Sequence, residues 1–179
     1  TNETPLVNFP MLIKIKDGTP EGFEHKYANP DGSDIRFIDS NGNLLSQSNG
    51  LEFIYDHTGI VAVIHNGATY FYRKNAQNDI IALLDSNGSV VVKYKYDAWG
   101  KCLTTVVDSS ATEIAALNPF RYRSYYFDTE TGFYFLKTRY YDPEIGRFIT
   151  IDDIEYLDPS SINGLNLYCY CFNNPILYV

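Results

Sequence analysis

The sequence predicts an all-β fold in which stacked antiparallel β-hairpins form a twisted, curled sheet or partial shell, with one or two short helices. Composition is the first reason: the 179 residues include 16 Tyr and 11 Phe but one Met and one Trp, and Tyr and Phe favour pleated, half-buried surfaces. A repeated turn unit is the second reason. The third is that the segments beside these turns alternate apolar and polar residues, the period of a β-strand.

The repeated unit has an aromatic or apolar pair, then Asp, then two or three variable residues, then Gly and another apolar run. Its six copies are centred on Asp39, Asp56, Asp85, Asp97, Asp128 and Asp142. The Asp-to-Asp steps are 17, 29, 12, 31 and 14 residues, so the two long steps indicate degenerate copies in between. One such copy is RKNAQNDI, where Asn75 and Asn78 stand in the places of Asp and Gly.

The chemistry of the unit is that of a hairpin turn. Asp or Asn can bond its own backbone two residues on, and Gly adopts a positive φ without a Cβ clash. Asn tolerates the same conformation, which explains Asn78. Since a lone hairpin is not stable, successive hairpins must stack into a continuous sheet.

The flanking segments carry the strand pattern. Lys93 and Lys95 alternate with apolar residues in VVVKYKY, and Lys137 and Arg139 alternate in the same way through FYFLKTRYY, so both read as strands. The outermost strands would expose their edges. We therefore expect either a capped, closed sandwich or barrel-like fold, or oligomers formed by strand pairing.

Helix is scarce. Residues 109–117 (SSATEIAAL) carry capping residues and good helix formers before Asn118-Pro119, which predicts one short helix. Residues 1–48 are richer in Gly, Pro and Asn, with strands expected at 11–17 and 34–39. We predict an N-terminal β cap over 1–48 and a core of repeats over 49–179.

Charge excludes several classes of function. The net charge of -8 and the pI of about 4.7 argue against nucleic acid or an anionic membrane as partner. No apolar run is long enough to span a bilayer, and no signal peptide opens the chain. The three Cys and three His lack metal-ligand spacing, so no metal or cofactor is expected.

Two further local patterns receive structural interpretations. Cys169 and Cys171 are expected to be small buried hydrophobes on one strand face. The acidic clusters at Asp152, Asp153, Glu155 and Asp158 and at Asp31, Ser33 and Asp34 lack calcium-loop spacing and are expected to be solvated.

Several segments together resemble the C-terminal core of rearrangement-hotspot (RHS) or tyrosine-aspartate (YD) repeat proteins. They are YKYDAWGK, NPFRYRSYYFDTETGFYFLKTRYYDPEIGRFITID and INGLNLYCYCFNNP, and the resemblance covers residues 51–179. In that family, which includes bacterial polymorphic toxins and more distantly animal teneurins, YD repeats wind a strip of sheet into a shell around a C-terminal toxin or effector. The resemblance implies a structural fragment of a secreted or cell-surface protein, inert in isolation. Its partners would be upstream repeats and a C-terminal cargo.

The family's core also carries an aspartyl self-cleavage site. By resemblance Arg139 matches the arginine of the RYYDP motif, and Asp152 matches the first acid, although Asp153 replaces the usual following Pro. The second acid would be the residue after Val179, so we expect no self-cleavage of this chain and no enzyme activity. Arg139 and Asp152 would then be a partial site or a simple ion pair.

A weaker resemblance concerns the N-terminal part. Residues 9–45 look like the start of a module of unknown function attached to lectin-like β-sandwiches, although Asp34–Leu45 also reads as one more hairpin. This keeps a carbohydrate-binding surface module as an alternative function, beside the aspartyl autoprotease.

Overall fold

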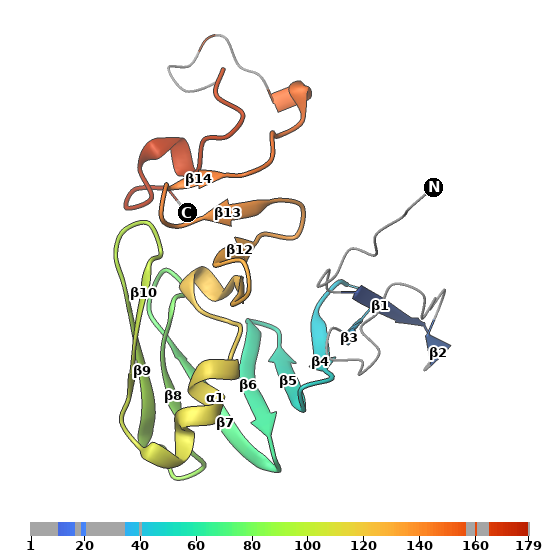
Figure 1. Cartoon of the computed structure of the whole chain (residues 1–179), viewed down its shortest axis with the longest axis vertical. Helices are drawn as coiled ribbons and strands as arrows, with labels where there is room; N and C mark the ends of the chain where they lie inside the picture. The colour runs from blue at the N-terminus through green and yellow to red at the C-terminus, as the bar shows by residue number, and fades with distance from the viewer. Residues whose placement is uncertain are drawn as a thin grey trace, which may run out of the picture. The chain divides into compact units, whose positions relative to one another are not determined.

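Hairpins joined by tight turns make up most of the structure (Figure 1). The computed structural model describes residues 11–16, 19–20, 35–39, 41–156, 160 and 165–178. The strands are β1 (Met11–Lys16), β2 (Thr19–Pro20), β3 (Ile35–Ile38), β4 (Leu44–Gln47), β5 (Leu51–Asp56), β6 (Gly59–His65), β7 (Ala68–Lys74), β8 (Ile80–Leu84), β9 (Val90–Tyr96), β10 (Cys102–Val106), β11 (Tyr126–Asp128), β12 (Phe133–Phe135), β13 (Tyr140–Asp142) and β14 (Arg147–Phe148). The helices are α1 (Thr112–Leu117) and the short 3-10 helices η2 (Ser109–Ala111), η3 (Tyr122–Ser124), η4 (Ile154–Tyr156) and η5 (Cys171–Asn173).

All six predicted Asp-to-Gly turns join consecutive antiparallel strands. In every one, Oδ1 of the Asp accepts a hydrogen bond from the backbone N–H two residues later. The six turn glycines have φ between 68° and 108°. At the degenerate copy, Asn75 Oδ1 accepts from the N–H of Gln77, and Asn78 has φ 64°. The hairpin repeat is confirmed.

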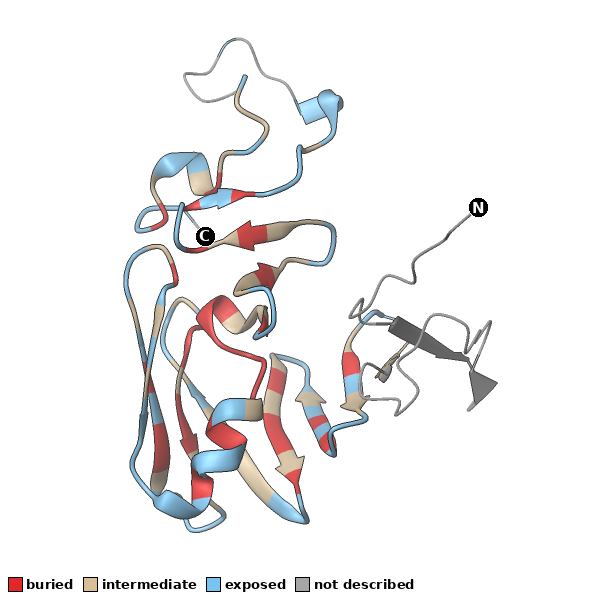
Figure 2. Cartoon of the chain, viewed as in Figure 1, coloured by how far each residue is buried: buried red, intermediate tan, exposed pale blue. Residues whose placement is uncertain are grey.

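The chain divides into two compact units, of which the first contains the described residues up to Phe71 together with Asp85–Asn87. Its strands are hydrogen-bonded in the order β2-β1-β3-β4-β5-β6-β7. β1 pairs with β3 in parallel, which the repeat did not predict, and the other pairs are antiparallel. Along β5, buried Leu51 and Phe53 alternate with exposed Glu52 and Ile54 (Figure 2).

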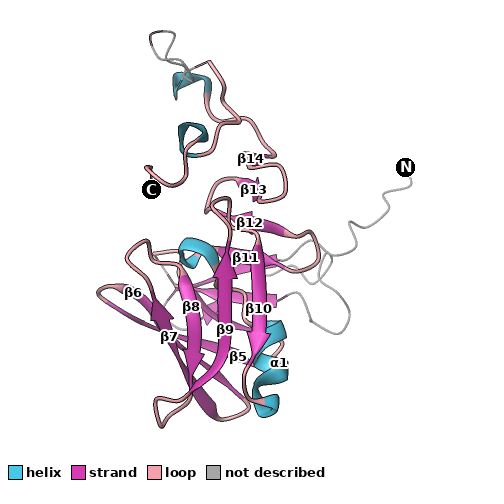
Figure 3. Cartoon of the chain, turned by 90° about the vertical axis from the view of Figure 1, so that its left-hand side faces the viewer, coloured by secondary structure: helices cyan, strands magenta, loops and turns pink. Residues whose placement is uncertain are grey.

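The second unit contains Tyr72–Leu84 and Gly88–Val179. Strands β8, β9 and β10 pair antiparallel, and α1 lies against β10 (Figure 3). Lys93 and Lys95 of β9 are exposed while Val92 and Tyr94 are buried, which confirms the predicted alternation. The predicted helix over 109–117 is confirmed as η2 followed by α1, and Asp108 caps it by accepting from the N–H of Ser110.

A separate four-stranded sheet of the second unit has the order β11-β12-β13-β14. Its core is a cluster of buried aromatic side chains, formed by Tyr122, Tyr134, Tyr141, Phe148 and Tyr170. The predicted class of all-β, hairpin-stacked fold with a short helix is confirmed. The expectation of a closed sandwich or barrel-like fold is wrong, because among the described strands neither hydrogen-bonded order returns to its first strand.

One predicted strand is also wrong. The alternation through FYFLKTRYY predicted continuous strand, but the chain turns back at Leu136–Arg139, where the N–H of Leu136 donates to the carbonyl of Arg139. Lys137 takes the left-handed conformation with φ 63°, so a turn forms without Gly. The reversal pairs Phe135 with Tyr140 and brings their rings to 5.1 Å. Cross-strand aromatic packing favours two short strands over one long one.

The expectations for the last cysteines need the same correction. Cys169 lies in an isolated bridge with Arg147, and Cys171 opens η5 with φ 47°, so the two do not share a strand face. Both thiols are free and half-buried. Of the acidic clusters, Asp153 and Glu155 are exposed, as expected, while Asp31, Ser33, Asp34 and Asp158 lie outside the described residues.

Candidate functional site

The two residues of the predicted partial site lie side by side. Arg139 directly precedes β13, and Asp152 follows β14 by four residues, so the β13–β14 hairpin brings them to one end of the small sheet. Nη1 of Arg139 lies 2.8 Å from Oδ2 of Asp152, with 20% and 30% of the two side chains exposed. The sequence therefore identified a real ion pair. Its role in catalysis stays a prediction.

Both members of this pair are held by further contacts. The guanidinium of Arg139 stacks over the ring of Phe148 at 3.5 Å from its centroid, a cation–π geometry. The carbonyl of Leu167 accepts hydrogen bonds from Nη1 of Arg139 and from the N–H of Asp152. Oδ1 of Asp152 accepts from the N–H of Asp153. The pair is thus fixed by a neighbouring strand and by the later segment at Leu167.

The chemistry open to this arrangement follows from its charges. An aspartyl mechanism needs two carboxyls that share a proton, so that one acts as acid and the other as base. In the described part of the chain, Oδ2 of Asp152 pairs with Arg139 and its Oδ1 accepts a hydrogen bond from the backbone N–H of Asp153. The pair by itself supplies an oriented carboxylate and an orienting cation.

Three tyrosine hydroxyls donate hydrogen bonds to the β9–β10 turn, a second group of contacts that was not predicted from the sequence. Tyr122 donates to the carbonyl of Ala98 at 2.9 Å, Tyr141 to that of Trp99 at 2.7 Å, and Tyr134 to that of Gly100 at 2.9 Å. Three consecutive turn carbonyls therefore each receive one hydroxyl. We call these three tyrosines with residues 98–100 the tyrosine-capped turn.

Packing at the tyrosine-capped turn is tight. Gly100 has φ 90°, and a Cβ placed on it would lie 2.6 Å from Cδ1 of Tyr122. A Cβ on Gly146 would lie 2.7 Å from Cε3 of Trp99. The Nζ of Lys101 also reaches Oε2 of Glu144 at 2.7 Å across the surface. Glycine is thus needed here for close approach as well as for conformation.

Burial keeps these phenols neutral. Burial raises the pKa values of Tyr122, Tyr134 and Tyr141 above the ordinary value for tyrosine. Nearby charges and hydrogen bonds have smaller effects on these pKa values than burial does. Burial also raises the pKa of Tyr94 to about 12. A neutral hydroxyl donates to a carbonyl, whereas a phenolate cannot. The hydrogen bonds from these hydroxyls to the turn carbonyls support a structural role for the tyrosines.

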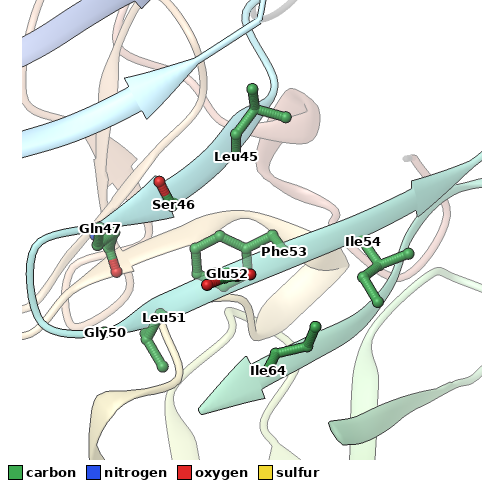
Figure 4. A pocket seen from close by; sticks show the side chains of 9 residues that line it. All are labelled: Leu45, Ser46, Gln47, Gly50, Leu51, Glu52, Phe53, Ile54 and Ile64. Atoms are coloured by element: carbon green, nitrogen blue, oxygen red, sulfur yellow. The ribbon is translucent and has the colours of Figure 1, made fainter. Parts of the chain in front are cut away.

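Two open hollows lie on the described surface. A groove of about 390 Å³ on β4, β5 and β6 is lined by side chains that include Leu45, Ile54 and Ile64, with Glu52 its one titratable lining residue (Figure 4). A second hollow of about 460 Å³ includes Asp79 and Asp97. Both of these carboxylates already accept hydrogen bonds from neighbouring backbone or side-chain groups. The acidic side chains of the second hollow are thus already engaged in local hydrogen bonds.

No group of three or more His, Cys, Asp or Glu side chains in the described ranges is arranged to hold a metal ion. None of the helices described has both the length and the apolarity needed to cross a membrane.

Comparison with known proteins assigns the fold to a family. The family model described as Teneurin YD-shell matches residues 39–176, which is most of the chain and includes all six repeat copies. The chain belongs to the teneurin YD-shell family. The resemblance to RHS and YD-repeat proteins is thereby confirmed, and it includes the residues around Arg139 and Asp152.

Relatives of this YD-shell chain are much longer proteins. The tRNA3(Ser)-specific nuclease WapA of Bacillus spizizenii is 38% identical over 128 residues, which are 71% of this chain and 5% of that protein. The tRNA nuclease WapA of Bacillus subtilis is 43% identical over 110 residues, 62% of this chain and 4% of that one. The crystal structure of TcdB2-TccC3-Cdc42 matches with a TM-score of 0.55 and 26% identity, covering 70% of this chain and 6% of the other.

Sequence reasoning missed two groups of residues in this YD-shell chain. The capping tyrosines were predicted only as residues that favour pleated, half-buried surfaces, and Arg123, which is buried and bonded to a distant segment, was not singled out. The available signal was the dense RYRSYYFD stretch, in which two arginines stand among aromatic residues. Alternation alone does not show that such an arginine points inward.

Proposed function

We propose that this chain is part of the wall of an RHS-type shell that encloses and presents a C-terminal toxin or effector cargo, without catalytic activity of its own. The main observation that supports this proposal is the series of paired hairpins with Asp–Gly turns, one of which is the tyrosine-capped turn. Membership of the YD-shell family and relatives that include WapA nucleases support it. Upstream repeats and the cargo are the proposed partners, in a secreted or cell-surface protein. The division into a cap over 1–48 and a core over 49–179 is part of the same proposal.

Protection of the downstream segment tests enclosure. In the full-length protein that contains this chain, we expect a protease to degrade the downstream segment far more slowly than the same segment expressed alone. Replacing buried Tyr141 with Ala should remove that protection, because it empties the core of the small sheet. Tyr156→Ala, at an exposed position, is the matched control. Equal digestion of the enclosed and the isolated segment would contradict a shell.

The second candidate function is aspartyl self-cleavage of the longer protein, and the 2.8 Å pairing of Arg139 with Asp152 favours it. In this proposal Asp152 is one acid of a dyad and Arg139 orients it. Intact mass measured over days should show a second species in the full-length protein and none in Asp152→Asn. Asp153→Asn is the neighbouring control. Cleavage that persists in Asp152→Asn would exclude this role.

A further inference from the structure

Arg123 is a charged side chain in the aromatic core of the second unit. It is 6% exposed, and its guanidinium lies over the rings of Tyr122 at 5.2 Å and Tyr170 at 5.6 Å. Burying a charge is unfavourable unless it is paired and hydrogen-bonded. The acceptors of this guanidinium therefore indicate what the residue does.

Those acceptors all belong to one segment about 50 residues later in the chain. Nη2 of Arg123 donates to the carbonyl of Pro175 at 2.5 Å and to that of Tyr178 at 3.0 Å. Nη1 donates to Sγ of Cys171 at 3.4 Å. The two shortest contacts go to backbone oxygens, so they do not depend on which side chains the segment carries.

The side chains of that segment provide little anchorage of their own. Ile176 and Leu177 are 69% and 73% exposed, and Tyr178 is also exposed. Only Pro175 is buried among these four. Beside the burial of Pro175 and the ring contact of Tyr178 with Phe172 at 5.4 Å, the charge-assisted hydrogen bonds from Arg123 tie the backbone of this segment to the core.

The backbone is strained at both ends of this contact. Arg123 and Ser124 have φ values of 50° and 57°, and Cys171, Phe172 and Asn173 have 47°, 49° and 59°. Non-glycine residues adopt this left-handed region at a cost in free energy. At the arginine end, the backbone N–H of Arg123 donates to Oδ1 of buried Asp79 at 2.9 Å, which holds the backbone from which the side chain extends. Such strained conformations persist where surrounding contacts determine them.

We propose that Arg123 is a backbone clamp that holds Pro175–Tyr178 against the aromatic core independently of the side chains of that segment. Through the clamp, Arg123 acts as a positioning residue for whatever chain follows the segment. The clamp itself is inferred from the contacts of Arg123 alone. Its role in orienting a C-terminal cargo rests on the proposed function.

Hydrogen exchange tests the clamp in this chain without any cargo. Arg123→Met should raise the exchange rates of amides in 173–178 by about tenfold or more, because charge-assisted bonds are lost. The amides of β9 should keep their protection. Arg73→Met, at an exposed arginine of the same unit, and Ile176→Ser should leave both regions unchanged.

Three outcomes overturn the clamp: unchanged exchange at 173–178 in Arg123→Met, an equal rise in β9, or a rise as large in Ile176→Ser. If Arg123→Met does not fold, Arg123→Lys keeps the charge but has one ammonium in place of the two-armed guanidinium. Labelling of Cys171 by a thiol reagent should then speed up relative to Cys102. An unchanged ratio overturns the proposal, whatever the cargo experiment shows.

Discussion

The contact between Gly100 and Tyr122 makes the sharpest prediction about stability. Gly100→Ala places a Cβ 2.6 Å from Cδ1 and 2.8 Å from Cγ of a ring that is buried and hydrogen-bonded. The left-handed backbone costs an L-residue about 1–2 kcal/mol. Overpacking a rigid site adds about 1–3 kcal/mol. We therefore expect Gly100→Ala to lower the free energy of unfolding by about 2–5 kcal/mol.

Gly88→Ala separates the two contributions. Gly88 occupies the equivalent place in the neighbouring hairpin, with φ 81° and no atom within 4 Å of the added Cβ. It should lose only the conformational part, about 1–2 kcal/mol. The difference between the two variants measures the clash with Tyr122.

Urea unfolding followed by the fluorescence of Trp99 suits this comparison, because the chain has one Trp and it adjoins Gly100. In a Tyr122→Ala background, which removes the whole ring, the cost of Gly100→Ala should fall to that of Gly88→Ala, which is a double-mutant cycle on the contact. Equal costs of the two alanine variants in the wild-type background would refute the close approach.

Three further expectations concern the same unit. Tyr134→Phe should lower the free energy of unfolding in urea by about 1–3 kcal/mol, because the carbonyl of Gly100 loses its hydrogen-bond donor inside the core. Tyr156→Phe, at an exposed site, should leave the free energy of unfolding unchanged. Equal effects of the two variants would contradict the tyrosine-capped turn. Burial raises the pKa values of Tyr96, Tyr134, Tyr141 and Tyr170, so the unfolded state loses these protons first. The stability that these four tyrosines contribute should be constant below pH about 10 and should be lost as the pH rises above it. Tyrosinate absorbance that rises before unfolding would contradict that. Asp152→Asn should lower the free energy of unfolding by at most about 1 kcal/mol, because the ion pair with Arg139 is partly exposed. Arg139→Ala should lower it more, since this variant also loses the stacking on Phe148. The reverse order of the urea midpoints would show that charge contributes more than packing at this site.

Local chemistry made the hairpins predictable. Each Asp accepts from an N–H two residues away, and each Gly adopts a positive φ, so the information lies within four or five adjacent residues. The same local reasoning identified the Asn75–Asn78 turn and the helix after Asp108. Alternation was less reliable, since Lys137 adopts a left-handed turn conformation that its residue type does not favour.

Contacts between distant residues could not be read in this way. That Arg139 meets Asp152 depended on resemblance to a family, because nothing in the spacing alone requires it. The hydroxyls of Tyr122, Tyr134 and Tyr141 donate to backbone carbonyls. Because every residue has a backbone carbonyl, the sequence does not indicate which one accepts each hydrogen bond. Arg123 poses the same difficulty, as its acceptors are backbone oxygens of Pro175 and Tyr178.

The tyrosine-capped turn also has a consequence for the order of folding. Its donors lie 24, 34 and 42 residues after their acceptors, whereas the turn itself closes over four residues. Local turns form quickly, and non-local contacts must first overcome the entropy of loop closure. During synthesis we therefore expect the carbonyls of residues 98–100 to stay hydrated until their donors in η3, β12 and β13 have been made. Docking of the small sheet should accordingly be the slow, late phase of refolding, visible as the last change in Trp99 fluorescence.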